Sequence, residues 1–322
     1  MRDFARPTIV VSKCLEFDAC RYNGQMIPDE FVSKLQEHVD FIPVCPEIAI
    51  ELGTPRETIR VVLSGEDRRL IQPTSGRDVT DEMGQFADQF LASLSDVDGF
   101  ILKNRSPSCG IKDVKVYSAG ERPAVLHKSS GLFGGAITDR FPRAAIEDEG
   151  RLKNFKIREH FLTKLYTLST FRAIKTQKSM KVLVNFQSDN KYLFMAYNQK
   201  ELKVLGNIVA NRDKKSIEEV LDAYEEHLGL LFARAPRFTS NINVMMHIMG
   251  YFSDYLSSGE RGHFLELLEK YRDGKLPLSS PLSVLKSWVI RFEHPYLLRQ
   301  TFFEPYPEEF VEITDSGKGR DF

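Results

Sequence analysis

Residues 8–14 read Thr-Ile-Val-Val-Ser-Lys-Cys, and this stretch decides how the first half of the chain folds. A short apolar run that ends in polar residues is typical of a β-strand. Comparable runs lie at 41–44, 58–63 and 100–102. We therefore expect four strands in the first 103 residues of the sequence.

Polar stretches with helical spacing separate these strands. Residues 28–39 and 79–94 are predicted to be helices, and Thr80 or Asp81 could cap the second one. Strand–helix alternation predicts an α/β fold, a Rossmann-like and mostly parallel sheet. The glycine-rich segment 131–135 predicts a tight turn or loop where the backbone passes closely.

The second half of the chain changes character after the acidic segment 147–149. Apolar residues recur there at helical spacing, and Ser216 followed by Glu219 is a capping-box pattern. We expect a catalytic α/β domain over 1–149 and an all-α domain over 150–322, with a polar tail from 314. Helices are predicted at 151–175, 216–231, 242–256, 262–271 and 284–292.

Charge is distributed unevenly in a chain whose net charge is only −1. Residues 1–150 hold 18 basic and 24 acidic side chains, whereas residues 151–215 hold 15 basic and 4 acidic ones. Such a basic block indicates either a solvated helix face or a polyanionic partner.

The N-terminus lacks a secretory signal, and no apolar run is long enough to cross a membrane. Four cysteines in 322 residues do not form a disulfide scaffold. We therefore expect a cytoplasmic protein whose thiols stay reduced.

Three of the cysteines follow predicted strands. These are Cys14, Cys45 and Cys109. Ligands of α/β sheets bind outside the carboxyl ends of strands, so three thiolates could meet there and hold a soft metal or an iron–sulfur cluster. Their spacing matches no local zinc motif, and buried cysteines that act as small hydrophobic residues fit the spacing equally well.

The sequences around these cysteines resemble the thiouracil desulfidase family. The matching segments are Cys14-Leu15 with Cys20-Arg21-Tyr22-Asn23-Gly24, Cys45-Pro46-Glu47, and Ser106-Pro107-Ser108-Cys109-Gly110. The second half resembles a helical domain often fused behind this one, through 247–252 and 271–278. The whole arrangement is similar to fused desulfidases that act on 4-thiouridine in transfer RNA.

This resemblance implies a 4Fe–4S cluster on Cys14, Cys45 and Cys109, with one iron that has no protein ligand. That iron would bind the substrate's sulfur as a Lewis acid, in a hydrolytic and non-redox reaction. By motif position, Glu47 would move protons and Ser106 would position water or substrate. The family pattern leaves Cys20 outside the ligand set, although a fourth ligand would close the cluster.

Contacts to the substrate are less defined by the sequence. Arg21 and Tyr22 could contact substrate or serve packing, and Lys103 and Asn104 could contact a nucleotide. A transfer RNA would meet the basic block, where side chains on one side of a helix would contact phosphates. The candidates for these phosphate contacts are Lys153, Lys156, Lys164 and Lys175.

The sequence thus predicts a desulfidase of 4-thiouridine in transfer RNA. One alternative is a desulfidase of free thiouracil or thiouridine. Another is a non-enzymatic iron–sulfur sensor that binds nucleic acid.

Overall fold

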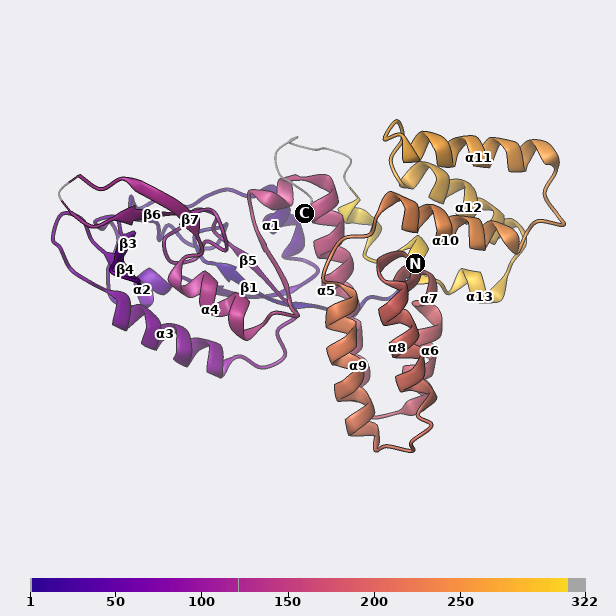
Figure 1. The fold of residues 1–322 in the computed structure, drawn as a ribbon, viewed down its shortest axis with the longest axis horizontal. Helices are drawn as coiled ribbons and strands as arrows, with labels where there is room; N and C mark the ends of the chain where they lie inside the picture. The colour runs from indigo at the N-terminus through magenta and orange to yellow at the C-terminus, as the bar shows by residue number, and fades with distance from the viewer. Residues whose placement is uncertain (1, 121, 312–322) are drawn as a thin grey trace. The chain divides into compact units, whose positions relative to one another are not determined.

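The computed structural model describes residues 2–120 and 122–311 (Figure 1). The chain forms two compact units, one over 5–170 and one that combines 171–311 with residues 2–4. The polar tail expected from 314 onward lies outside the described residues. The division expected after residue 149 stays a prediction.

The first unit contains a fully parallel sheet of four strands in the order β2-β1-β5-β8. Val10 at the centre of β1 pairs with Ile42 of β2 and with Phe100 of β5. This sheet confirms the predicted α/β fold class. Its strands are β1 (Thr8–Ser12), β2 (Asp40–Val44), β5 (Gly99–Leu102) and β8 (Ala145–Asp148).

A second sheet has the order β4-β3-β6-β7, so the run at 58–63 does not join the parallel sheet as expected. The connection Gly65-Glu66 returns the chain directly into β4, with Gly65 at a φ of 65°. Such a short turn produces an antiparallel hairpin and separates β3 from β1. The strands are β3 (Arg60–Ser64), β4 (Asp67–Ile71), β6 (Val114–Ser118) and β7 (Val125–Ser129).

Helices α1 to α5 accompany these sheets, and α5 begins at Phe155, after a 3₁₀ turn over Arg151–Lys153, where the sequence predicted one helix over 151–175. Helix α1 is shorter than the predicted 28–39 and is capped by Asp29. Neither Thr80 nor Asp81 caps α3, because the Thr80 hydroxyl instead accepts the Leu70 N–H of β4 at 2.8 Å. The helices are α1 (Glu30–Leu35), α2 (Pro46–Ala49), α3 (Thr80–Ser93), α4 (Leu132–Arg140) and α5 (Phe155–Lys175).

The core of the first unit lies between sheet and helices. Val10 and Phe100 from the parallel sheet share one buried cluster with Met83 of α3 and Phe133 of α4. Burial of such side chains is the main favourable term in folding. The cluster fixes the strand ends that carry the cysteines.

The second unit is helical, as predicted, and contains no strand among its described residues. The expected capping box is present, since Ser216 and Glu219 each bond the other's backbone N–H. None of the helices in 2–120 and 122–311 is long and apolar enough for a membrane span. The helices are α6 (Met180–Asp189), α7 (Lys191–Tyr197), α8 (Gln199–Ala210), α9 (Ile217–Leu231), α10 (Phe238–Gly250), α11 (Ser258–Arg272), α12 (Ser279–Arg291) and α13 (Pro295–Leu298), with short 3₁₀ turns η2 (Thr301–Phe303) and η3 (Glu308–Phe310). The 3₁₀ turn η1 (Arg151–Lys153) belongs to the first unit.

Candidate functional site

The topology brings the three cysteine-bearing segments to one edge of the parallel sheet. Strands β2, β1 and β5 are neighbours, so their carboxyl ends lie side by side. Cys45 directly follows β2, Cys14 lies just beyond β1, and Cys109 lies in the loop after β5. The Lys13 N–H donates to the Val44 carbonyl at 2.8 Å and continues the strand pairing up to the cysteines.

Cys20 lies among these thiols as well. Its buried side chain hydrogen-bonds with the thiols of Cys14 and Cys45, and its carbonyl oxygen lies 4.0 Å from the Cys45 Sγ. All four cysteines of the chain are free thiols. The family pattern left Cys20 outside the ligand set, and the structure places it beside two of the predicted ligands.

Three of the thiols, those of Cys20, Cys45 and Cys109, are stabilised in their protonated form. The hydrogen bond with Cys14 raises the pKa of Cys20 to about 11, and contact with Cys20 together with burial raises the pKa of Cys45. Burial raises the pKa of Cys109 to about 12. Because metal ions bind thiolates, loading this site must release protons.

The three candidate ligand cysteines lie on separate loops. No three His, Cys, Asp or Glu side chains of the described residues converge closely enough to hold one metal ion. In an iron–sulfur cluster each thiolate binds a different iron, so the ligands surround the group from separate loops. Cys14, Cys45 and Cys109 come from three such loops.

The loop that carries Cys109 is held by the glycine-rich segment. Gly131 and Gly134 donate their backbone N–H groups to Gly110 and Ser108 at 2.7 and 2.9 Å. A Cβ on Gly131 would lie 2.5 Å from the Ser108 carbonyl oxygen, and one on Gly134 would lie 2.5 Å from that of Cys109. The predicted close backbone passage is therefore present.

The glycine-rich segment is not the loop that we expected. Gly131 is the N-cap of α4, and the next residues form the first turn of this helix. The helix begins here because its first N–H groups find acceptors in the loop 107–110.

Glu47 lies in the first turn of the short helix α2, two residues after Cys45. Its Oε2 accepts two bonds from Arg56, from Nη2 at 2.6 Å and from Nε at 2.8 Å. Its Oε1 accepts a bond from the Ser108 hydroxyl at 2.6 Å. The carboxylate is thus held on both oxygens beside the cysteines.

Ser106 and Ser108 form a short relay that ends on Glu47. Their hydroxyl oxygens lie 2.9 Å apart, and the Ser106 oxygen also accepts the Cys109 N–H at 3.1 Å. Ser108 has one proton, which the near carboxylate attracts more strongly than the Cys109 sulfur at 3.7 Å. Ser106 must then be the donor to Ser108, so the relay runs from Ser106 through Ser108 to Glu47.

Sequence reasoning selected Ser106 and missed Ser108, which is fully buried and touches Glu47 directly. It also missed Arg56, whose side chain is only 4% exposed. The Ser-Pro-Ser-Cys motif contains the first of these residues. Nothing in the sequence pattern indicates that Arg56 reaches Glu47.

Lys103 and Asn104 lie at the same end of the sheet, but both are bonded within the protein. The Lys103 ammonium donates to the carboxylate of Glu149, which accepts the Asn104 N–H at 2.7 Å as well. These contacts brace the ends of β5 and β8. The structure thus gives both residues internal partners.

Arg21 and Tyr22 lie in the loop between Cys20 and Gly24. The Arg21 guanidinium carbon lies 5.6 Å from the centre of the Tyr22 ring, and this ring is 43% exposed. An exposed ring backed by a cation offers a surface for another ring.

The four candidate phosphate contacts have different surroundings. Lys175 pairs with Asp222 and Glu225 of α9 at 2.9 and 2.6 Å. Lys164 is half-buried, and burial lowers its pKa to about 8. Lys153 and Lys156 are exposed. The structure therefore does not present these lysines as one uniform basic surface.

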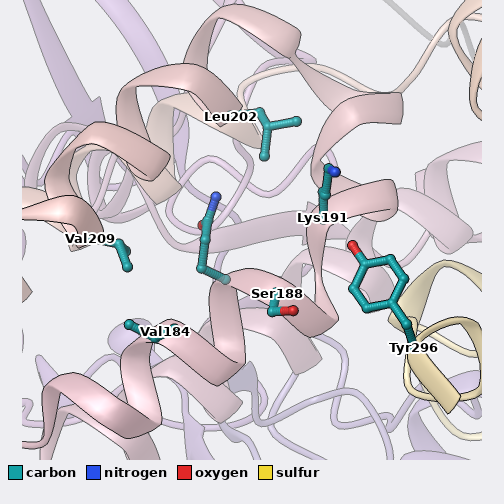
Figure 2. A pocket seen from close by; sticks show the side chains of 7 residues that line it. Val184, Ser188, Lys191, Leu202, Val209 and Tyr296 are labelled. Carbon is teal, nitrogen blue, oxygen red and sulfur yellow. The ribbon is translucent and has the colours of Figure 1, made fainter.

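The helical unit has a cavity of about 470 Å³ that is distinct from the thiol cluster. Lys191 and Tyr296 flank one end of it, and Val184 and Val209 flank the other (Figure 2). Its lining combines apolar side chains with one cation and lacks a carboxylate. It holds no acid–base pair of the kind formed by Glu47 and its partners.

Comparison with known families divides the chain into two matching parts. Residues 9–149 match the family model described as 2-thiouracil desulfurase. Residues 191–307 match a model described as a protein of unknown function, DUF1722.

Individual proteins show similarity to parts of the chain. It is 27% identical over 158 residues to the uncharacterized protein YbgA of Escherichia coli (strain K12). This match covers 48% of this chain and 93% of YbgA. The chain is 37% identical over 109 residues to the uncharacterized protein YbbK of Bacillus subtilis (strain 168), 32% of this chain and 72% of that protein. Among solved structures, the [4Fe-4S]-dependent thiouracil desulfidase TudS is 26% identical, with a TM-score of 0.37, and the match covers 46% of this chain and 93% of TudS.

Proposed function

The chain belongs to the 2-thiouracil desulfurase family, and we propose that it removes sulfur from a thiolated pyrimidine and replaces it with oxygen from water. One observation carries this proposal: Cys14, Cys45 and Cys109 follow neighbouring parallel strands, and the Glu47 carboxylate lies among them. Thiolates beside a positioned acid–base group suit C–S hydrolysis.

Cys14, Cys45 and Cys109 would hold a 4Fe–4S cluster. When bound, it supplies an iron without a protein ligand, which attracts the soft sulfur of the substrate. The family resemblance and the three separate loops support this cofactor. Cys20 is then a neighbouring thiol rather than a ligand.

The protein's own part in the reaction is proton transfer. Ser106 can take a proton from the attacking water while it passes its own proton to Ser108, which hands a proton to Glu47 Oε1. Glu47 then returns a proton to the leaving sulfur or to the ring nitrogen. The second proton of water leaves the new hydroxyl as the carbonyl forms, so water gives its oxygen to the pyrimidine carbon and sulfur departs as hydrogen sulfide.

We propose 4-thiouridine in transfer RNA as the substrate. The support is the helical unit that follows the catalytic part and the basic excess of residues 151–215. Exposed cations such as Lys153 and Lys156 would contact phosphates, and a buried thio-base would have to turn outward to reach the site.

Free thiouracil or thiouridine is the second candidate substrate. The ion pairs of Lys175 favour it, because they reduce the charge that is available to RNA. A free base carries no phosphates and needs no basic surface.

One experiment separates the candidates. The cluster is reconstituted without oxygen, and the near-ultraviolet absorbance of the thio-base is followed for 4-thiouridine in transfer RNA and for free 4-thiouracil in parallel. We expect rapid loss with the RNA, weakened steeply by salt. Loss with the free base alone would contradict the RNA substrate, and loss with neither would favour a nucleic-acid-binding sensor.

A further inference from the structure

Arg56 occupies an unusual place for an arginine. It lies in the loop between α2 and β3, yet its side chain is only 4% exposed. Arginine is seldom fully buried unless it is paired, because the desolvation of its charge is costly. A buried arginine in a loop therefore indicates a specific partner.

The partners of Arg56 come from three segments around the thiols. Its Nε and Nη2 both bond the Oε2 atom of Glu47, at 2.8 and 2.6 Å. Its Nη1 donates to the carbonyl oxygens of Cys20 and Gly53, each at 2.9 Å. Its backbone N–H donates to the Tyr22 carbonyl at 2.8 Å. One residue thus ties the loop of Cys20 to the helix of Glu47.

The bonds from Arg56 determine which carboxylate oxygen of Glu47 can accept a proton from the serine relay. A glutamate side chain has three rotatable bonds, and two guanidinium bonds to one oxygen restrict them. Oε2 is occupied by Arg56, so only Oε1 can accept from Ser108.

We propose that Arg56 is the positioning residue of the active site. It holds Glu47 so that Oε1 faces the serine relay, and it does not contact the substrate itself. This inference rests on the proposed desulfidase function. Lysine would supply the charge but not the planar fork that grips one oxygen from two nitrogens.

The test uses cluster-loaded full-length protein with Arg56→Met, Arg56→Lys and, as a matched control, Arg60→Met. Arg60 lies on β3 and stacks on Tyr117, away from Glu47. We expect Arg56→Met to lower kcat about 100-fold with little change in KM, since misplacement of a catalytic group has this effect. Arg56→Lys should recover part of the rate, and Arg60→Met should match the wild type.

A double-mutant cycle gives the decisive comparison. In a Glu47→Gln background, Arg56→Met should cost no further activity, because the group that it orients is gone. Equal losses of kcat in both backgrounds, or a change in KM alone, would overturn the proposal.

A second measurement keeps the inference separate from the proposed function. Thermal unfolding of the cluster-free protein is compared for Arg56→Met, Glu47→Gln and the double variant. Strong coupling between the two residues supports the clamp even if no thio-base is converted, and additive shifts in melting temperature would overturn it. Failure of the wild type to desulfurate would contradict the proposed function alone.

Discussion

Ion pairs at the carboxyl end of the parallel sheet and in the helical unit differ in how deeply they are buried. At the sheet, Glu47 and Arg56 are 14% and 4% exposed and are bonded on several atoms. In the helical unit, Lys175 and its partner Asp222 are 38% and 70% exposed. Buried pairs lose much when one partner is removed, whereas exposed pairs contribute little. Removal of one partner should therefore have a large effect at the sheet and a small effect in the helical unit.

The largest effect is expected from loss of a cluster ligand. We expect Cys14→Ser, Cys45→Ser and Cys109→Ser to lose iron and to reduce activity at least about 1,000-fold, since the metal supplies several kcal/mol to the transition state. Cys20→Ser is the matched control and should keep the iron. Iron and acid-labile sulfide content, with visible absorbance, measure the outcome. Iron loss in Cys20→Ser would make Cys20 a ligand.

The serine relay should behave as one unit. Removal of either hydroxyl disconnects water from Glu47, so Ser106→Ala and Ser108→Ala should each lower kcat about 100-fold. The double variant should be no slower than either single variant. Multiplying losses in the double variant would show that the two hydroxyls act independently.

Two glycines of the first unit differ in the space available for a side chain. Gly131→Ala places a methyl group 2.5 Å from backbone carbonyl oxygens and should destabilise the protein by about 2 kcal/mol. Gly84→Ala, inside α3 with no atom within 4 Å, should stabilise it by about 0.5–1 kcal/mol. Denaturant unfolding measures both changes. Equal effects would contradict the close packing of α4 on the Cys109 loop.

The buried carboxyl group of Asp148 should make the stability of the protein depend on pH. Burial raises its pKa to about 6, whereas in the unfolded chain the carboxyl ionises near pH 4, so the folded state holds the extra proton between these values. Stability from this group is therefore lost as pH rises from about 4 to 6.

The variant Asp148→Asn removes this titration. Its free energy of unfolding should exceed that of the wild type by about 2 kcal/mol at pH 7 and should be similar to it near pH 4. Urea unfolding of the cluster-free protein at the two pH values measures the difference. A variant with no gain at pH 7 would show that the buried carboxylate is fully compensated by its bond from Arg151 N–H.

The smallest effect is expected at Lys175. Its partners Asp222 and Glu225 are well exposed, so Lys175→Met should change the free energy of unfolding by only about 0.5 kcal/mol. A loss above about 2 kcal/mol would remove the contrast between the two units.

The strands that carry the cysteines could be predicted because each contains a short apolar run, although the sheet buries the runs of β1 and β5 and only Val44 of the edge strand β2. Sequence reasoning missed β7, whose side chains Val125 to Lys128 are exposed at a sheet edge and show no burial pattern. It missed the contact of Arg56 with Glu47, since loop geometry brings these residues together and no sequence period encodes it. Cys20 was left out of the predicted ligand set because the family pattern uses three cysteines. Its place beside Cys45 depends on how the loop 14–24 folds back, which no sequence period encodes.

Isotope labelling shows whether water supplies the oxygen that replaces sulfur. The reconstituted protein converts 4-thiouracil and 4-thiouridine-containing transfer RNA in H₂¹⁸O without oxygen, and the released sulfide and the label in the pyrimidine carbonyl are counted. Hydrolysis through the Glu47 relay predicts one ¹⁸O incorporated for each sulfide released, with both lost in Glu47→Gln. Unlabelled product, or a Glu47→Gln variant as active as the wild type, would contradict it.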